Sequence, residues 1–241
     1  MALGDSLTAG YGADPGQSYP DYLQRELDKL GYAYHVVNLG VSGETTSDAL
    51  ARVDVVIAQR PRIVILEFGG NDGLRGLPIT AARANLDRVM ARLQAAHIRI
   101  LLAGITLPPN YGQDYIRPFQ TMYHDLAVRY HAPLIPFLLE GVFEHGLFQQ
   151  DGIHPNAQGY AMVAQTVLRY LRPLLGPMAK GGRSATPRNP TGCRGIARPR
   201  TGLQGLLPWL PGSVPYSRAR AITQGGGKHP GCPRAPLCKM C

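Results

Sequence analysis

The chain has 241 residues, 44% of them hydrophobic, and a formal net charge of +9 at pH 7. This length accommodates one sizeable domain with a tail, and no apolar run approaches the roughly 20 residues of a membrane-spanning helix. The excess charge is confined to the C-terminal end: residues 1–180 hold 15 of the 25 basic residues and all 16 acidic ones. The first 180 residues are therefore nearly neutral, which argues against a nucleic-acid-binding domain.

Strands and helices alternate along the first 180 residues. Apolar residues at helical spacing predict helices over 19–30, 47–59, 80–96 and 156–171, and a further helix that ends near Tyr130. Thr80 is the predicted N-cap of the helix over 80–96. Continuous apolar runs predict buried strands over 34–39, 62–68, 99–105 and around 134–135, with loops at 69–76 and 107–114 and an ambiguous stretch at 142–148. This alternation, repeated about five times, predicts an open, mostly parallel sheet with helices on both faces.

The chain opens on a short apolar strand followed by Gly4-Asp5-Ser6-Leu7. We expect Gly4 to permit a tight turn that exposes the Ser6 hydroxyl in a loop. Met1-Ala2-Leu3 is short for a buried strand of about 5–6 residues and contains no secretory signal. We therefore expect the N-terminus to be truncated.

Three Gly-rich loops, at Gly4, Gly40 and Gly69, each follow a predicted strand. In open parallel sheets, ligands bind beyond the carboxyl ends of the strands. Because these ends share one edge, we expect the three loops to meet there and form a site.

Asp151 and His154 lie three residues apart on one predicted turn, with Gly152 allowing the bend. A carboxylate at this spacing can accept a hydrogen bond from one imidazole nitrogen and leave the other free to take a serine proton. Taken alone, the pair is more often a helix N-terminal cap. With Ser6 at the same sheet edge, the catalytic interpretation becomes the stronger one.

Acyl transfer by a serine also needs hydrogen-bond donors for the developing oxyanion. The candidates are the backbone amides of Ser6 and Gly43 and the side-chain amide of Asn71, with Gly40 as the competing glycine. Singly, each of these residues is more often an ordinary turn residue. Together they supply the complement that an esterase needs.

Four blocks of this sequence resemble, in order, those of the SGNH (GDSL) hydrolases. The blocks are Gly4-Asp5-Ser6-Leu7, Ser42-Gly43-Glu44-Thr45, Gly69-Gly70-Asn71-Asp72 and Asp151-Gly152-Ile153-His154-Pro155. Two longer stretches, residues 66–76 and 107–112, are similar to the bacterial multifunctional thioesterase I / protease I / lysophospholipase (arylesterase) group. The resemblance covers about residues 1–175 and implies the family's three-layer, flavodoxin-like fold.

The resemblance also implies roles for these residues. Ser6 would be the nucleophile, His154 the general base and acid, and Asp151 its orienting partner. Ser6, Gly43 and Asn71 would form the oxyanion hole; Gly43 is preferred to Gly40 because the family's donor lies in the Ser-Gly-acid-Thr segment. The loop containing Pro108, Asn110 and Tyr111 resembles one that borders the acyl-binding groove.

We therefore expect a serine esterase, without metal or organic cofactor, that hydrolyses fatty acyl esters and also acyl thioesters or lysophospholipids. An SGNH carbohydrate acetylesterase is the alternative within the family. We expect a monomer with a small-molecule substrate and neither a nucleic-acid partner nor a membrane span. The resemblance implies a periplasmic or secreted protein.

Residues 1–178 are predicted to be the hydrolase domain and residues 179–241 a basic tail, disordered or non-native. Residues 181–241 contain eleven Gly and nine Pro, ten basic residues and no acidic one. The tail also holds all four cysteines: Cys193, Cys232, Cys238 and Cys241. Their C-x5-C-x2-C spacing near His229 matches no common structural zinc site. A polyanion-binding protein that uses this tail is the rival from another functional class.

Overall fold

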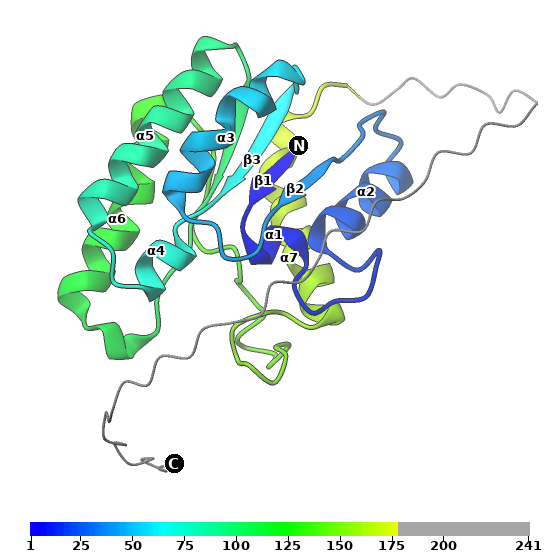
Figure 1. Ribbon diagram of the computed structural model, residues 1–241. Coiled ribbons are helices and arrows are strands. Elements are labelled where there is room, and N and C mark those ends of the chain that lie inside the picture. The colour runs from blue at the N-terminus through cyan, green and yellow to red at the C-terminus, as the bar shows by residue number, and fades with distance from the viewer. Residues whose placement is uncertain (178–241) are drawn as a thin grey trace, which may run out of the picture. The chain divides into compact units, whose positions relative to one another are not determined.

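The computed structural model describes residues 1–177, which form a five-stranded parallel sheet between two layers of helices (Figure 1). The strands are β1 (Ala2–Gly4), β2 (Asn38–Gly40), β3 (Ile63–Glu67), β4 (Arg99–Ala103) and β5 (Leu134–Ile135). Their order is β2-β1-β3-β4-β5, and all neighbours are parallel. From β1 the chain adds β2 on one side of the sheet and then β3, β4 and β5 on the other. The carboxyl ends of β1 and β3 therefore flank the switch point, where ligands bind in such sheets.

Seven α-helices connect or follow the strands in the described residues. They are α1 (Ser6–Ala9), α2 (Tyr19–Lys29), α3 (Thr46–Ala58), α4 (Gly70–Leu74), α5 (Ile79–Ala95), α6 (Gln113–Tyr130) and α7 (Ala157–Leu171). Helices α3, α5 and α6 pack side by side on one face of the sheet, and α2 packs against α7 on the other (Figure 1). None of the helices within residues 1–177 combines the length and the apolarity needed to cross a bilayer.

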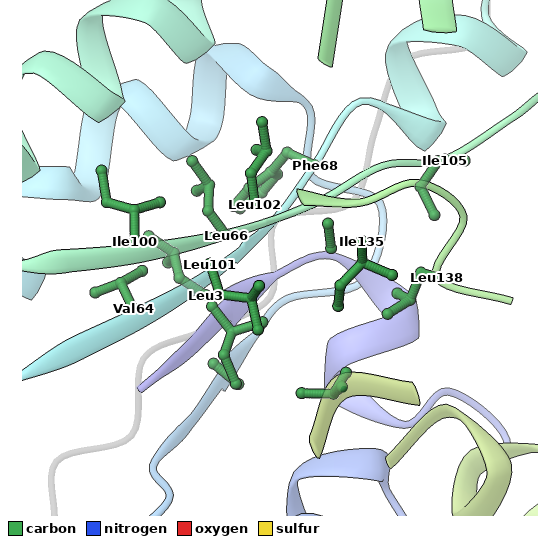
Figure 2. Packing of buried hydrophobic residues seen from close by; sticks show 14 of the residues in the cluster. Leu3, Val64, Leu66, Phe68, Ile100, Leu101, Leu102, Ile105, Ile135 and Leu138 are labelled. Carbon is green, nitrogen blue, oxygen red and sulfur yellow. The ribbon is translucent and has the colours of Figure 1, made fainter. Parts of the chain in front are cut away.

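The core lies on both faces of the sheet (Figure 2). Every residue of β3 is buried, as the continuous apolar run predicted for a strand covered by helices on both sides. Leu3 on β1 and Leu101 on β4 are also fully buried. The three-layer α/β fold predicted from the sequence is confirmed, and the segments that follow β1, β2 and β3 meet at one edge of the sheet, where Asn71 bonds to Asp5 and to Glu44.

The strand predicted at residues 34–39 is wrong over most of its length. Only the end of that run, together with Gly40, forms β2, because β1 offers three residues for pairing. The side chain of Gln24, on α2, takes the backbone partners that a longer strand would supply. Its Nε2 donates to the Tyr34 carbonyl at 3.0 Å, and its Oε1 accepts from the Val36 amide at 2.7 Å.

Two predicted loops contain helical turns instead. Helix α4 lies within 69–76, and a 3₁₀ turn, Pro109–Tyr111, lies within 107–114. Elements of three to five residues are too short for a periodic apolar pattern to indicate them. Residues 142–148 form irregular turns that end in an isolated bridge between Phe148 and Pro155.

The N-cap predicted at Thr80 is also wrong. Helix α5 begins one residue earlier, and its N-cap is Pro78. The Pro78 carbonyl accepts from the amides of Ala81 and Ala82, and no side chain caps the helix. The proline ring fixes its own φ and so restricts the chain where the helix begins. The predicted tail at 179–241, with its four cysteines, lies outside the described residues.

Candidate active site

Ser6 was predicted to lie in a loop. It is instead the first residue of the one-turn helix α1, just after β1. Asp5 is the N-cap, and its Oδ1 accepts from the Leu7 amide at 3.0 Å. Gly4 is needed for space: a Cβ there would lie 2.5 Å from Glu67 Oε2 and 2.8 Å from the Glu67 carbonyl oxygen. The structure thus places Ser6 at the carboxyl edge of the sheet, just after a glycine that lies tightly against the end of β3.

The loop before α7 brings His154 and Asp151 to Ser6. Ser6 Oγ lies 2.9 Å from His154 Nε2, although the two residues are 148 positions apart. His154 Nδ1 lies 2.7 Å from Asp151 Oδ2. Gly152 has a φ of +67°, a left-handed conformation that folds the Asp151–His154 turn back on itself. Ser6, His154 and Asp151 therefore form one continuous hydrogen-bonded series.

The Asp151 carboxylate is held in its ionised form. Partial burial acts against ionisation, but hydrogen bonds from the His154 amide and ring and from the Ile153 amide outweigh it and lower the pKa of Asp151 to about 2. Oδ1 accepts from the two amides, at 3.0 and 2.9 Å, which leaves Oδ2 for the ring. With a carboxylate acceptor on that side, Nδ1 carries the ring proton and Nε2 faces Ser6 as an acceptor.

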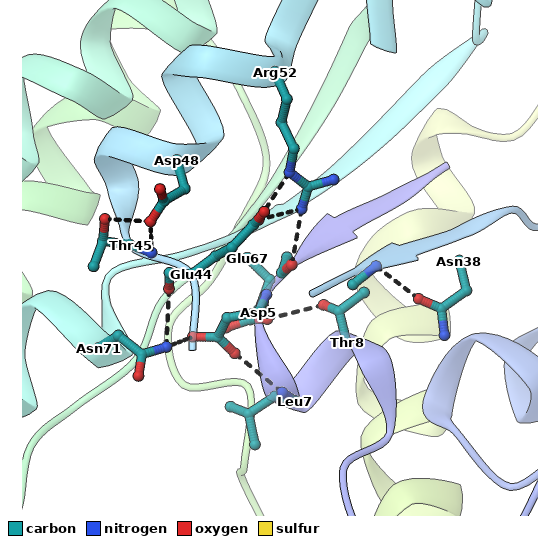
Figure 3. Close-up of polar contacts among 12 residues, drawn as sticks. Asp5, Leu7, Thr8, Asn38, Glu44, Thr45, Asp48, Arg52, Glu67 and Asn71 are labelled. Carbon is teal, nitrogen blue, oxygen red and sulfur yellow. Dashed lines mark hydrogen bonds and ion pairs between the residues drawn. The ribbon is translucent and has the colours of Figure 1, made fainter. Parts of the chain in front are cut away.

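The candidate oxyanion donors come from neighbouring segments of the same sheet edge; Figure 3 shows one of them, Asn71, between Asp5 and Glu44. Within residues 1–177, the amides of Ser6 and Gly43 donate to no other group. Asn71 Nδ2 donates to Asp5 Oδ2 at 3.0 Å and to the Glu44 carbonyl at 2.9 Å. Asn71 therefore bonds to the residue before Ser6 and to the residue after Gly43, and both of its N–H groups are engaged.

Two arginines hold the loop that carries Gly43. Arg52, on α3, donates to Glu44 Oε2 at 2.8 Å and to the Gly4 carbonyl at 3.1 Å, which ties this loop to the end of β1 (Figure 3). Arg75 donates to the Gly43 carbonyl at 2.8 Å. Gly43 has a φ of +84°, which favours glycine at this point of the loop.

The segment containing Pro108, Asn110 and Tyr111 lies beside α4. The Tyr111 hydroxyl donates to the carbonyl of Leu74, the last residue of α4, at 2.8 Å. Pro108 and Asn110 are exposed. Through α4 this segment is linked to Asn71, which places it at the same edge of the sheet as the Ser6–His154 pair.

Comparison with known proteins matches residues 2–162 to the GDSL-like lipase/acylhydrolase family. The chain belongs to this family. It is 40% identical to esterase TesA of Pseudomonas aeruginosa over 177 residues, which cover 73% of this chain and 88% of TesA. It is 38% identical to thioesterase 1/protease 1/lysophospholipase L1 of Escherichia coli, also over 177 residues, covering 73% of this chain and 84% of that protein. The predicted resemblance is confirmed.

The crystal structure of TesA matches the fold with a TM-score of 0.70, covering 72% of this chain and 98% of the chain in that crystal structure. Family membership and these relatives make the chain an ester-bond hydrolase. In this GDSL-family chain the first three sequence blocks follow β1, β2 and β3, and the fourth is joined to the first by the contact between His154 and Ser6.

One important group was missed by the sequence analysis: a buried carboxyl pair behind Ser6. Glu67 is fully buried, and its Oε2 accepts from the Asp5 amide at 3.1 Å and from Thr8 Oγ1 at 2.8 Å. Glu67 Oε1 has no hydrogen-bond partner within residues 1–177. The signal was present, since Glu67 is the one charged residue in the apolar run of β3.

Two buried carboxyl groups this close cannot both carry a charge. Burial, and then the charge of Asp5, raise the pKa of Glu67 well above its ordinary value. Burial also raises the pKa of Asp5, but hydrogen bonds from the Leu7 amide and the Asn71 side chain act in the opposite direction. Asp5, with its N–H donors, is therefore the ionised member, and Glu67 is the neutral acid.

Residues 1–177 contain no group of three or more His, Cys, Asp or Glu side chains arranged to hold a metal ion. His229 and the cysteines weighed as a zinc site lie beyond the described residues.

Proposed function

We propose that this chain hydrolyses acyl esters through a covalent intermediate on Ser6. The observation that carries the proposal is the continuous hydrogen-bonded series from Ser6 Oγ through His154 to Asp151. Serine needs an adjacent base to become a nucleophile, and that base needs a third group to orient it. This chain supplies both from a single turn, Asp151–His154.

In the first half of the reaction, Ser6 Oγ attacks the acyl carbon while its proton moves to His154 Nε2. Asp151 stabilises the imidazolium that forms and holds the ring in place. The proton then passes from Nε2 to the leaving alcohol or thiol, which departs and leaves the acyl group on Ser6. In the second half, His154 takes a proton from water, the resulting nucleophile attacks the acyl-enzyme, and the proton returns to Ser6 as the acid leaves.

We propose that the Ser6 and Gly43 amides and Asn71 stabilise the oxyanion in both halves. The two backbone amides are free to do so in the described part of the chain. Asn71 must exchange one of its two bonds, to Asp5 or to the Glu44 carbonyl, for a bond to the oxyanion. The negative charge on the substrate oxygen makes it a stronger acceptor than a neutral carbonyl, so the Glu44 bond is the one we expect to break.

The proposed substrates are fatty acyl esters, with acyl thioesters and lysophospholipids as further candidates. Support comes from the relatives, one named an esterase and the other a thioesterase and lysophospholipase. The Tyr11 ring, half exposed and 4.5 Å from the His154 ring, gives the site an apolar surface. Pro108, Asn110 and Tyr111 are proposed to border the acyl-binding groove.

The proposal is tested with a panel of p-nitrophenyl esters and acyl-CoAs of increasing chain length. We expect hydrolysis by the wild type, and loss of it in Ser6→Ala and His154→Ala at unchanged circular dichroism. Full activity in Ser6→Ala would end the proposal. Preference within the panel identifies the acyl length and the leaving group.

We further propose that the protein acts as a monomer and in the periplasm or outside the cell. All residues assigned to the mechanism come from one chain, which supports a monomer. The resemblance to exported bacterial hydrolases supports the compartment. Sedimentation of the purified protein and fractionation of cells that express it test the two points.

A further inference from the structure

The side chain of Gln149 joins the segment that follows Ser6 to the segment that carries His154. Its Nε2 donates to the Tyr11 carbonyl at 2.6 Å and to the Pro155 carbonyl at 2.9 Å. Its backbone amide donates to the His154 carbonyl at 2.8 Å. Gln149 therefore bonds to His154 and Pro155 on one side of the site and to Tyr11 on the other.

The chemistry of these partners fixes the orientation of the amide. Both groups that face Nε2 are carbonyls, which only accept, so an amide nitrogen with two hydrogens is required there. Gly12 makes room for this arrangement: a Cβ at Gly12 would lie 2.0 Å from Gln149 Oε1. Gly12 also has a φ of +71°. The fit thus depends on a glycine on the Ser6 side and an amide on the His154 side.

The contact with Tyr11 leads directly back to the proposed nucleophile. The Tyr11 amide donates to the Ser6 carbonyl at 3.0 Å, and the Tyr11 carbonyl also accepts from the buried Tyr160 at 3.1 Å. A short series of bonds therefore runs from Ser6 through Tyr11 and Gln149 to His154. This series joins the two segments in addition to the direct contact between Ser6 Oγ and His154 Nε2.

We propose that Gln149 is a positioning residue that sets the separation of Ser6 and His154 during acylation. The inference rests on the function proposed above. Gln149 touches no reacting atom in that mechanism; it acts through Tyr11 and through the backbone on both sides of His154. A displacement of about 1 Å between a nucleophile and its base is enough to cost a large factor in rate.

The test is Gln149→Met, which keeps the length of the side chain and removes the two donors. Gln150→Met, at the exposed neighbouring position, is the matched control. The fraction of competent sites is titrated with a fluorophosphonate, and kcat and KM for a p-nitrophenyl ester are then expressed per titrated serine. We expect kcat per titrated site to fall about tenfold or more in Gln149→Met, with KM nearly unchanged, and to stay at the wild-type level in Gln150→Met.

A purely structural role would give a different result. It would lower the melting temperature and the titratable fraction but leave kcat per titrated site unchanged, and that result would overturn the inference. Equal losses in both methionine variants would also overturn it. Failure of the proposed function is distinguished by Ser6→Ala, since activity that survives in that variant removes the mechanism itself, whatever Gln149 does.

Discussion

The two halves of the active site are built in different ways. The Ser6 half rests on the buried sheet, and its supporting carboxyl groups, Asp5 and Glu67, are 2% and 0% exposed. The His154 half is a turn in which residues 151–153 are exposed, held by bonds within the turn and by Gln149 next to it. The first half is therefore coupled to the stability of the core, and the second can be changed without unfolding the protein.

Among the residues that support Ser6 and His154, this contrast predicts the largest catalytic loss on the exposed side, at Asp151→Asn. The amide cannot stabilise the imidazolium and presents either orientation to His154, so kcat should fall by about 10⁴-fold. Steady-state kinetics measure this loss, and a melting curve at neutral pH should show a folded protein with only a modest decrease in melting temperature.

The pH dependence of the same variant sharpens the test. Because the folded-state pKa of Asp151 lies near 2, below the ordinary 3.8, its contribution to stability is present above about pH 4 and disappears as the pH falls toward 2. The modest difference in melting temperature between wild type and Asp151→Asn should therefore vanish at low pH. A difference that persists undiminished at pH 2 contradicts the assignment.

On the buried side, Asn71→Ala should lose both activity and stability. Removal of one oxyanion donor costs about 100- to 1,000-fold in kcat. The variant also leaves the buried Asp5 carboxylate without one of its donors, so the melting temperature should fall as well. Kinetics and calorimetry together check the pair of effects. A loss of activity at unchanged stability would show that the two halves do not differ as described.

The smallest effect at neutral pH is expected for Glu67→Gln. Glutamine keeps the acceptor for the Asp5 amide and Thr8 and places an uncharged group where Glu67 holds a proton. Activity should therefore stay within a few fold of wild type. Glu67→Leu, which removes the acceptor, is the contrasting variant and should be destabilised.

The sign of the pH effect at Glu67 is opposite to that at Asp151. Glu67 keeps its proton in the folded state at pH values where the unfolded chain has already released it. The wild type therefore loses stability as the pH rises above 4.5, the ordinary pKa of Glu67. The glutamine of the Glu67→Gln variant has no proton to lose, so the melting temperature of this variant should gain on that of the wild type with increasing pH. Parallel curves from about pH 4 to 9 would contradict a neutral Glu67.

The two halves were also predictable to different degrees. Ser6, Asp151 and His154 were predicted as the reacting groups because short Gly-containing blocks follow predicted strands or precede a helix and resemble the blocks of the family, and the structure brings the three side chains together. The α/β alternation likewise predicted the fold, since a continuous apolar run such as residues 63–66 is typical of a strand that is buried on both faces.

The supporting residues were not predictable in the same way. Glu67, Arg52 and Gln149 contact residues that lie 48 or more positions away, and these contacts exist only in the folded chain. The length of β2 was not predictable for a similar reason, because it depends on its partner strand and on Gln24 rather than on its own residues. Local patterns thus point to the proposed reacting groups, whereas the residues that hold them in place depend on packing.

The central claim is that Ser6 becomes covalently acylated. Its most direct test is peptide mapping by mass spectrometry after reaction with a fluorophosphonate that carries an alkyl chain. We predict one adduct per chain, on the peptide that contains Ser6, with labelling abolished in Ser6→Ala and strongly slowed in His154→Ala. A stoichiometric adduct on another residue, or undiminished labelling and hydrolysis in Ser6→Ala, would contradict the account.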